Sequence, residues 1–289
     1  MKTKKTESSV FQPGEAAIKI HSLIQAPLRL HCHKFDELVI VAKGKGVHFT
    51  EKEEYQINVG DVFFIKPGEY HGYRDTDKLE IINVLYFSEK AGLPLKNLKG
   101  SAGYRVLFEL EPAMRRKEGF KSKLNLSLDE LMKAETLIKK ISEELKSESP
   151  CGFFLAASYL MQLIAVLSRL YEKIPDTHSL PLMRLGNLLS YLENNYREKI
   201  SLDGLVKRFH ISKSSLIRAF RKISGTTPLD YLLKIRIAKA SELLKTPDGT
   251  ITEAALSSGF SDTNYFSRQF KKNTGMSPRD FRKLYAKVL

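Results

Sequence analysis

The chain has 289 residues, and its 42% hydrophobic content is enough for folded cores in two or three domains, which excludes a disordered basic protein. Its net charge of +14 and its pI near 9.5 indicate a polyanionic partner. The two cysteines, Cys32 and Cys151, lie far apart and give no disulfide framework, which fits a reducing cytoplasm. Residues 1–9 are polar and no apolar core of a signal peptide follows them, so we expect residues 1–16 to form a loose tail.

Short runs of β-branched and aromatic residues follow from residue 18 to residue 87. Their spacing predicts a small β-sandwich or barrel. The Lys-Gly-Lys-Gly stretch at 43–46 predicts a turn, and Glu51 to Glu54 predict the loop of a hairpin. The predicted strands are residues 18–24, 28–33, 37–42, 47–50, 55–59, 62–66, 71–74 and 80–87.

Side chains with the chemistry of metal ligands gather in these strands. His31, His33 and Glu37 are spaced His-x-His-x3-Glu, and Gly44 follows after six more residues. A second, partial pattern consists of Gly60, Pro67, Gly68 and His71. Together the two patterns resemble a cupin, the jelly-roll barrel. In metal-dependent cupins the three histidines and the glutamate bind one ion, and such a set suits Zn, Ni, Fe or Mn.

Residues 93–173 have a helical composition. An amphipathic helix is predicted at 104–116, where Pro112 must kink or end it. Ser127 is the predicted cap of a long helix that extends to residue 147. The apolar run 152–168 has about the minimum length for a membrane span, but its polar residues and the following Arg169 favour a buried helix. These helices either pack onto the barrel or form a dimer interface, and periodicity alone does not decide between the two.

After a predicted linker at 174–181, the same segment occurs twice at an offset of 50 residues. Phe220 corresponds to Phe270 and Pro228 to Pro278. Each copy reads as two helices joined by a tight turn. A long helix over 229–244 connects the copies, so that two recognition helices can enter successive major grooves about 34 Å apart.

The second helix of each copy has an apolar back and a front rich in hydrogen-bond donors and cations. Such a front is what recognition of base edges and phosphates in a major groove requires. Residues 178–289 carry eleven of the chain's fourteen net positive charges, which favours DNA binding over a merely solvated basic surface. The predicted DNA-binding residues are Lys213, Ser214, Ile217, Arg218 and Arg221 in the first copy, and Thr263, Asn264, Ser267, Arg268, Lys271 and Lys272 in the second.

Residues 181–289 resemble the DNA-binding domain of AraC/XylS-type bacterial transcription regulators. The resemblance implies base contacts by Ser214, Ile217 and Arg218 and by Thr263, Asn264 and Arg268. Ile217 departs from the polar residue often found there, and this favours a methyl contact to thymine. The signature comprises Gly259-Phe260-Ser261-Asp262, Tyr265-Phe266-Ser267-Arg268-Gln269-Phe270-Lys271-Lys272, Gly275-Met276-Ser277-Pro278 and Phe281-Arg282.

The same resemblance bears on the histidine-rich strands. In sugar-responsive AraC-type regulators the barrel usually binds its effector without metal, and the span from His31 to Ser88 is most similar to rhamnose-type members. This implies a carbohydrate effector and no cofactor, with the metal set as the weaker alternative. The candidate effector-binding residues are His31, His33, Glu37, His71 and Tyr73.

These features predict an α+β, multidomain protein. Residues 1–92 form a cupin-like effector-sensing domain, 93–173 a helical dimerisation segment, 174–181 a linker, and 182–289 an all-α domain with two helix-turn-helix units. We expect a cytoplasmic, sequence-specific transcription regulator that binds promoter DNA, forms a homodimer and contacts RNA polymerase, with no membrane association. The chain shows no nucleophile–base pair or phosphate-binding glycine loop, so no enzyme is predicted.

Two alternatives remain open. One is a metal-dependent cupin enzyme, such as an isomerase or dioxygenase, fused to a DNA-binding domain. The other is a non-specific, nucleoid-type DNA-binding protein.

Overall fold

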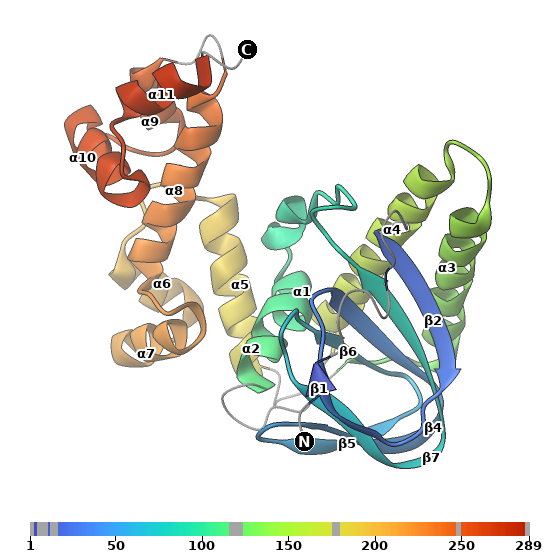
Figure 1. The fold of residues 1–289 in the computed structure, drawn as a ribbon. Coiled ribbons are helices and arrows are strands. Elements are labelled where there is room, and N and C mark those ends of the chain that lie inside the picture. The colour runs from blue at the N-terminus through green and yellow to red at the C-terminus, as the bar shows by residue number, and fades with distance from the viewer. Residues whose placement is uncertain are drawn as a thin grey trace. The chain divides into compact units, whose positions relative to one another are not determined.

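The computed structural model describes residues 3–4, 11, 17–115, 124–174, 180–246 and 250–286. It divides into two compact units, Met1–Gly186 and Asn187–Leu289, which we call the N-terminal and C-terminal units (Figure 1). The N-terminal unit combines a β-sheet with helices, and the described part of the C-terminal unit is all helical. The predicted α+β fold class, a β-domain followed by paired helix-turn-helix units, is confirmed.

The described strands of the N-terminal unit form one eight-stranded sheet, ordered β1-β3-β7-β4-β6-β8, with β2 also paired to β7 and β5 to β4. Apart from the parallel β1–β3 pair, these pairings are antiparallel. Figure 1 shows the sheet curling around its own interior. The strands are β1 (Thr3–Lys4), β2 (Ile18–Ile24), β3 (Leu28–Cys32), β4 (Asp36–Thr50), β5 (Glu54–Asn58), β6 (Asp61–Ile65), β7 (His71–Tyr86) and β8 (Leu124–Asn125).

Two of these strands are much longer than the sequence predicts. The turn predicted at 43–46 is wrong, because β4 runs through it, and β7 likewise joins the two predicted strands 71–74 and 80–87. Both long strands contain residues in the left-handed backbone conformation, which bend the strands without ending them. Their φ values are 72° at Gly44, 50° at Asp75 and 47° at Lys78. A Cβ at Gly44 would lie 2.2 Å from the Lys78 carbonyl oxygen, so only glycine permits this close approach.

The interior of the sheet holds an apolar cluster to which the four strands β4, β5, β6 and β7 contribute. β5 shows the expected alternation, with Tyr55 and Ile57 buried and their neighbours exposed. The cluster fixes the faces of the strands, since a slip of one residue would expose every buried side chain of a strand. Its members are Val39, Val41, Tyr55, Ile57, Phe63, Ile65, Tyr73, Leu79 and Ile81.

The N-terminal unit also contains helical segments, and the first long helix after the sheet, α3, begins as predicted. Ser127 caps α3 in a capping box: its hydroxyl accepts from the Glu130 N–H, and the Glu130 carboxylate accepts from the Ser127 N–H. The segments are η2 (Leu95–Gly100), α1 (Ala102–Tyr104), η3 (Arg105–Leu110), α2 (Glu111–Arg115), α3 (Leu128–Lys146) and α4 (Gly152–Glu172).

The helix around Pro112 does not end at that residue. The segment η3 before it is a π-helix, and the Glu111 N–H donates to the carbonyl of Val106, five residues back. Pro112 thereby falls in the first turn of α2, where its missing N–H is tolerated, and the helix continues to Arg115.

Helix α4 is long and apolar enough to cross a membrane by length and composition alone. Its buried residues nevertheless recur every three or four positions, from Ala156 and Leu160 to Leu167 and Tyr171, and the helix packs against α3 and α1. A stripe of this kind is typical of a helix in the core of a folded domain, as the sequence predicts.

The C-terminal unit contains the repeat. Helices α7 and α10 begin 50 residues apart, as predicted, and both end at a left-handed glycine, Gly225 and Gly275. The first helices of the two copies are capped 49 residues apart, by Ser201 and Thr250. The boundary between the two units falls in the chain within α5 (Leu180–Asn194), and the further helices are α6 (Leu202–Phe209), α7 (Lys213–Ser224), α8 (Pro228–Leu244), α9 (Ile251–Ser257), α10 (Thr263–Thr274) and α11 (Pro278–Ala286).

We predict that Gly103→Ala destabilises the N-terminal unit. The added Cβ would lie 1.9 Å from the carbonyl oxygen of Ser168 on α4, so α1 could no longer pack against that helix. Overpacking of this kind costs about 1–3 kcal/mol of unfolding free energy. Urea unfolding of the full chain, followed by circular dichroism, measures the change. In the control Gly204→Ala, the new Cβ meets only the Ser201 hydroxyl at 3.1 Å, and an equal loss in both variants would contradict the prediction.

Candidate functional site

The five predicted effector-binding residues line one cavity of about 110 Å³ inside the sheet. His31 lies on β3, His33 directly after that strand, and Glu37 near the start of β4. His71 and Tyr73 come from the first residues of β7, where His31 and His71 are cross-strand partners. Residues separated by 40 positions therefore meet in the sheet.

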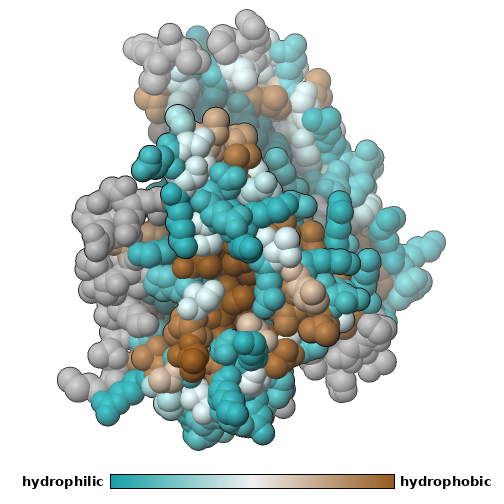
Figure 2. Space-filling view, turned by 90° about the vertical axis from the view of Figure 1, so that its right-hand side faces the viewer, coloured by the Kyte–Doolittle hydropathy of each residue, from teal (hydrophilic) through white to brown (hydrophobic). Residues whose placement is uncertain are grey.

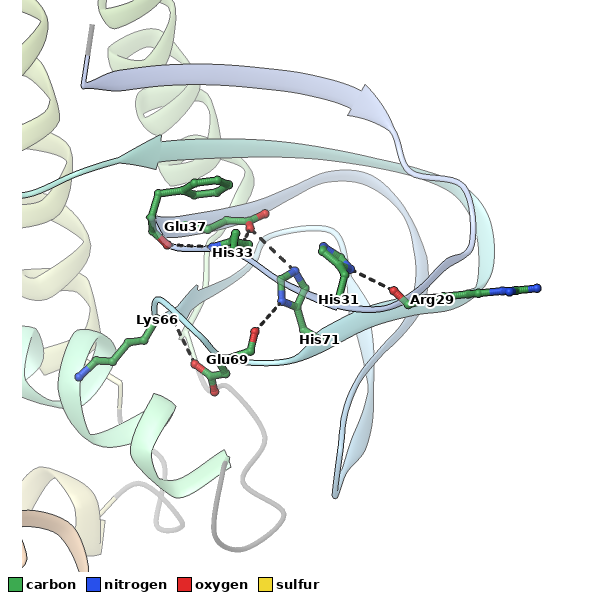
Figure 3. A network of polar contacts seen from close by, with 8 residues as sticks. Arg29, His31, His33, Glu37, Lys66, Glu69 and His71 are labelled. Atoms are coloured by element: carbon green, nitrogen blue, oxygen red, sulfur yellow. Dashed lines mark hydrogen bonds and ion pairs between the residues drawn. The ribbon is translucent and has the colours of Figure 1, made fainter. Parts of the chain in front are cut away.

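The backbone fixes the orientation of three imidazoles in this cavity. Nδ1 of His31 lies 3.0 Å from the Arg29 carbonyl oxygen, and Nδ1 of His33 lies 2.8 Å from that of Phe35. Nδ1 of His71 lies 3.4 Å from the carbonyl oxygen of Glu69 (Figure 3). A carbonyl oxygen only accepts hydrogen bonds, so an Nδ1 that bonds to one carries a proton.

The Nε2 atoms of two of these rings converge on one carboxylate. Nε2 of His33 lies 2.6 Å from Glu37 Oε2, and Nε2 of His71 lies 3.8 Å from the same oxygen. Both rings and the carboxylate are buried. Neither Nε2 has a partner in hydrogen-bond geometry among the described residues, and each contact with Glu37 is an ion pair when the ring is protonated. His31, Phe35 and His48 complete the surroundings as ring neighbours of these two histidines.

Burial lowers the pKa of His71 well below its ordinary value, and the neighbouring imidazoles of His31, His48 and His33 lower it further. Beside the cavity, burial raises the pKa of Asp36, which hydrogen bonds from Ser88 partly offset. At the position of His71, burial among other imidazoles therefore disfavours the cationic form of the ring.

Three polar residues of the cavity were missed by the sequence analysis: His21 on β2, Gln25 directly after that strand, and Asn83 on β7. His21 and Asn83 are cross-strand partners, and Asn83 Oδ1 is buried without a hydrogen-bond partner among the described residues. The available signal was a lone amide in the apolar run Ile81 to Leu85 of an otherwise buried strand. Nothing in the sequence tells which polar residue of β2 faces inward.

The second helix of the first repeat presents the predicted front to solvent. Lys213, Ser214, Arg218 and Arg221 are exposed and Ile217 is half-buried. On the opposite side, Leu216 and Phe220 are each 1% exposed. Lys213 pairs with Asp203 of the preceding helix, with Nζ 3.5 Å from the carboxylate oxygen in an exposed contact.

The second repeat has the same division between front and back. Asn264, Arg268, Lys271 and Lys272 are exposed, whereas Phe266 and Phe270 are fully buried. Thr263 and Ser267 are half-buried, and the Ser267 hydroxyl donates to the Thr263 carbonyl oxygen at 2.9 Å. Ser267 therefore has acceptor capacity for a ligand but no free hydroxyl proton. The structure thus places all eleven predicted residues on the fronts of two equivalent helices.

Comparison with known proteins matches both parts of the chain. Residues 205–284 match a helix-turn-helix domain family, and residues 25–118 match the AraC-like ligand binding domain family. The chain is 30% identical to the HTH-type transcriptional activator RhaS of Escherichia fergusonii, over 97% of each chain. It is 27% identical to the activator RhaR of Mannheimia succiniciproducens, over 91% of this chain and 90% of that protein.

Among solved structures, the chain is similar to the C-terminal domain of the two-component response regulator yesN from Fusobacterium nucleatum. The sequence identity is 33%, the match covers 33% of this chain and 93% of that domain, and the TM-score is 0.32.

The chain combines a domain that has an internal cavity with two helix-turn-helix units whose fronts are exposed and basic. This combination defines a ligand-responsive DNA-binding regulator. The full-length similarity to RhaS makes the assignment specific: the chain belongs to the AraC family of transcription regulators. The family resemblance identified in the sequence is confirmed, and the chain is a DNA-binding transcription regulator with a ligand-binding domain.

We predict that Arg268→Ala and Lys272→Ala have different effects on DNA binding. An exposed arginine on the front can contact guanine with two hydrogen bonds, and its loss should cost about 1–3 kcal/mol and relax the preference at one base position. Lys272 lies one turn later, where a phosphate contact is expected, and its loss should weaken all sequences alike. Selection of binding sites from a random pool separates the two effects.

The first repeat supplies the matched comparison, since Arg218 occupies the position equivalent to Arg268. Arg218→Ala should relax a different base position from Arg268→Ala. An unchanged sequence preference with uniformly lower affinity in Arg268→Ala would identify this arginine as a phosphate contact instead.

Proposed function

We propose that this protein is a transcription activator that recognises specific promoter sequences and responds to a small carbohydrate effector bound in its N-terminal cavity. The observation that carries the proposal is the duplicated helix pair, in which two helices 50 residues apart bury equivalent aromatic or aliphatic side chains and expose equivalent arginines. The activator role is supported by the relatives RhaS and RhaR, which are transcriptional activators.

DNA recognition is assigned to the fronts of α7 and α10. Exposed cations supply the salt-dependent affinity for phosphates, and the shorter polar side chains supply contacts to base edges. Ile217, which is half-buried, offers its apolar atoms to a thymine methyl group. The full set is Lys213, Ser214, Ile217, Arg218, Arg221, Thr263, Asn264, Ser267, Arg268, Lys271 and Lys272.

Effector binding is assigned to the cavity lined by His31, His33, Glu37, His71 and Tyr73. Its polar lining offers hydrogen-bond acceptors and donors to hydroxyl groups. Its volume of about 110 Å³ is well below the roughly 300 Å³ at which sites for drug-sized molecules begin. The effector is therefore a small molecule, at most of monosaccharide size.

Self-association is assigned to the helices after the sheet. Exposed large apolar side chains lie at the starts of α3 and α4, among them Leu128, Met132 and Phe154, and on β2 at Ile24. Figure 2 shows apolar side chains gathered on the side of the molecule that carries β2 and α3. Exposed apolar side chains in such number on one side of a unit are typical of an interface. A homodimer that contacts RNA polymerase from promoter DNA, in the cytoplasm, is the arrangement we propose.

The same observations favour a regulator over an enzyme. The relatives that match along their whole length are transcriptional activators. In the described residues the cavity offers imidazole, carboxylate, phenol and amide groups but no hydroxyl or thiol nucleophile paired with a base.

We predict that the full chain binds DNA from the region upstream of its own gene more tightly than random DNA of equal length. The logarithm of the affinity should fall with the logarithm of salt concentration, by about 0.9 per phosphate contact. Titration by fluorescence anisotropy, with and without candidate monosaccharides, measures both properties. Equal affinity for both DNAs in every condition would favour the non-specific, nucleoid-type alternative.

A further inference from the structure

We propose that Arg236 and Gly259 join the two helix-turn-helix copies and thereby set the separation of the two DNA sequences that the copies read. Arg236 lies on α8, which runs from the first copy to the second, and Gly259 lies in the turn between α9 and α10 (Figure 1). Neither residue belongs to the front of a recognition helix, so both are positioning residues. The proposal rests on the proposed function in so far as both fronts contact DNA.

The turn formed by residues 195–198, directly after α5, is a fixed part of the first copy. The Tyr191 ring on α5 packs edge-on against Phe209 of α6, with ring centroids 5.8 Å apart. Within the turn, the Glu198 N–H donates to the Asn195 carbonyl oxygen at 2.9 Å. The turn is followed closely by Ser201, the cap of α6. A group that holds this turn therefore also holds the first copy.

Arg236 holds this turn with two hydrogen bonds. Its Nε donates to the Tyr196 carbonyl oxygen at 2.7 Å, and its Nη2 donates to the Glu198 carbonyl oxygen at 2.8 Å. The donors of a guanidinium group form a rigid planar fork, so two such bonds fix the direction as well as the distance of the turn from α8. Burial lowers the pKa of Arg236 below its ordinary value, and the two carbonyl oxygens replace water that the cation has lost.

The same guanidinium group lies beside the second copy. Its central carbon is 6.0 Å from the centroid of the Phe260 ring, within the range of a cation–π contact. Phe260 is 3% exposed and packs against Phe266 of α10, with ring centroids 5.0 Å apart. One side chain of α8 thus contacts the entry to the first copy and the core of the second.

Gly259 brings the backbones of the two copies together. A Cβ at this position would lie 2.7 Å from the Tyr196 carbonyl oxygen and 2.9 Å from the Arg197 Cα. It would also lie 3.0 Å from Nε of Arg236. Only a residue without a side chain permits this approach. We call the contacts of Arg236 and Gly259 with the turn 195–198 the inter-copy contact.

The first copy shows that the turn itself does not require glycine. His210 lies nine residues after the cap Ser201, as Gly259 lies nine residues after the cap Thr250. Both residues are left-handed, with φ of 50° at His210 and 89° at Gly259, and His210 is exposed. A side chain is therefore accepted where the turn faces solvent, and its absence at Gly259 serves the inter-copy contact.

The consequence for DNA recognition is a fixed separation. Helix α8 and the inter-copy contact are two connections between the copies, and together they prevent one recognition helix from pivoting relative to the other. Such a pair binds tightly only where its two target sequences are spaced to match. Two inserted base pairs move one target by about 7 Å along the duplex and by about 70° around it.

The first test uses the full chain and the DNA site that it selects from a random pool. Affinity is measured for this site and for a lengthened site with two base pairs inserted between the two targets. The wild type should bind the selected site at least about a hundredfold more tightly, because the lengthened site loses the base contacts of one helix. Arg236→Ala should lower this ratio by about tenfold, the factor that corresponds to one hydrogen bond from a charged donor.

Lys234→Ala is the matched control, because it removes a positive charge from an exposed position of the same helix. Its ratio should equal that of the wild type even if both affinities fall. Gly259→Asn should lower the ratio as Arg236→Ala does, whereas His210→Asn should leave it unchanged, since asparagine tolerates the left-handed conformation. Wild-type ratios in Arg236→Ala and Gly259→Asn, or an equal loss in His210→Asn, would overturn the proposal.

The second test does not depend on DNA. Spin labels at Arg221→Cys and Lys271→Cys, in a chain that also carries Cys151→Ser at its exposed cysteine, report the distance between the two recognition helices. The distribution of distances should be narrow without further changes and with Lys234→Ala, and broad with Arg236→Ala. An unchanged narrow distribution in Arg236→Ala contradicts the inter-copy contact.

The two tests separate this proposal from the proposed function. A chain that selects no DNA site, but whose label distances broaden with Arg236→Ala, contradicts the proposed function alone. A chain that selects a site, but whose spacing ratio and label distances do not respond to Arg236→Ala, contradicts the inter-copy contact alone. Should Arg236→Ala not fold, Arg236→Lys takes its place in both tests, because lysine keeps the charge but not the planar fork.

Discussion

The pairing of β4 with β7 is the interaction on which the N-terminal unit depends. Within this ladder Glu37 lies opposite Leu85, whereas His71 lies opposite Thr50 at the other end. In a flat sheet, the fourteen residues between His71 and Leu85 would hold the two side chains about 46 Å apart, at about 3.3 Å per residue. The carboxylate of Glu37 instead lies 3.8 Å from the His71 ring, so the ladder must fold back on itself.

The residues that allow this folding lie midway along both strands. Gly44 on β4 and Asp75 and Lys78 on β7 adopt positive φ, and the register shifts repeatedly between Val41 and Val47. Such irregularities sharpen twist and bending without ending the pairing. The cavity is thus a consequence of strand distortion far from the cavity itself. A change at Gly44 should disturb the histidine cluster although it touches none of its members.

The difference between local signals and long-range strand pairing explains which parts of the fold could be predicted from the sequence. The helix-turn-helix units were predicted well because their signals are local: caps at Ser201 and Thr250, glycine stops, and a repeat that shows the pattern twice. The continuity of β4 and β7 could not be predicted, since Asp75 and Lys78 take left-handed conformations without being glycine. The members of the histidine cluster were found from their spacing, but their tautomers depend on backbone carbonyls that only the fold brings near.

In the C-terminal unit the main constraint is burial of apolar surface, because a single helix pair is too small to bury its own apolar face. Helix α8 supplies the missing surface to both copies. Its Ile237, Ala240 and Leu244 join Phe266 and Phe270 in one cluster around the second copy. Near its other end, the Tyr231 ring packs edge-on against Phe220 of the first. One rigid helix therefore holds both recognition helices, and the fronts of these helices are left free of any packing role.

The buried polar groups of the N-terminal unit fall into two kinds, and the difference identifies the site. Arg105 donates to the Lys99 carbonyl oxygen and pairs with Glu109, and Tyr171 donates to Glu111. These groups satisfy one another, as buried polar groups must if they serve packing alone. Asn83 Oδ1 is equally inaccessible and has no such partner among the described residues, whereas His33 Nε2 and His71 Nε2 share one carboxylate oxygen of Glu37. A fold that leaves a buried acceptor at a cavity loses stability there, and such a loss is understandable where a ligand supplies the missing partner.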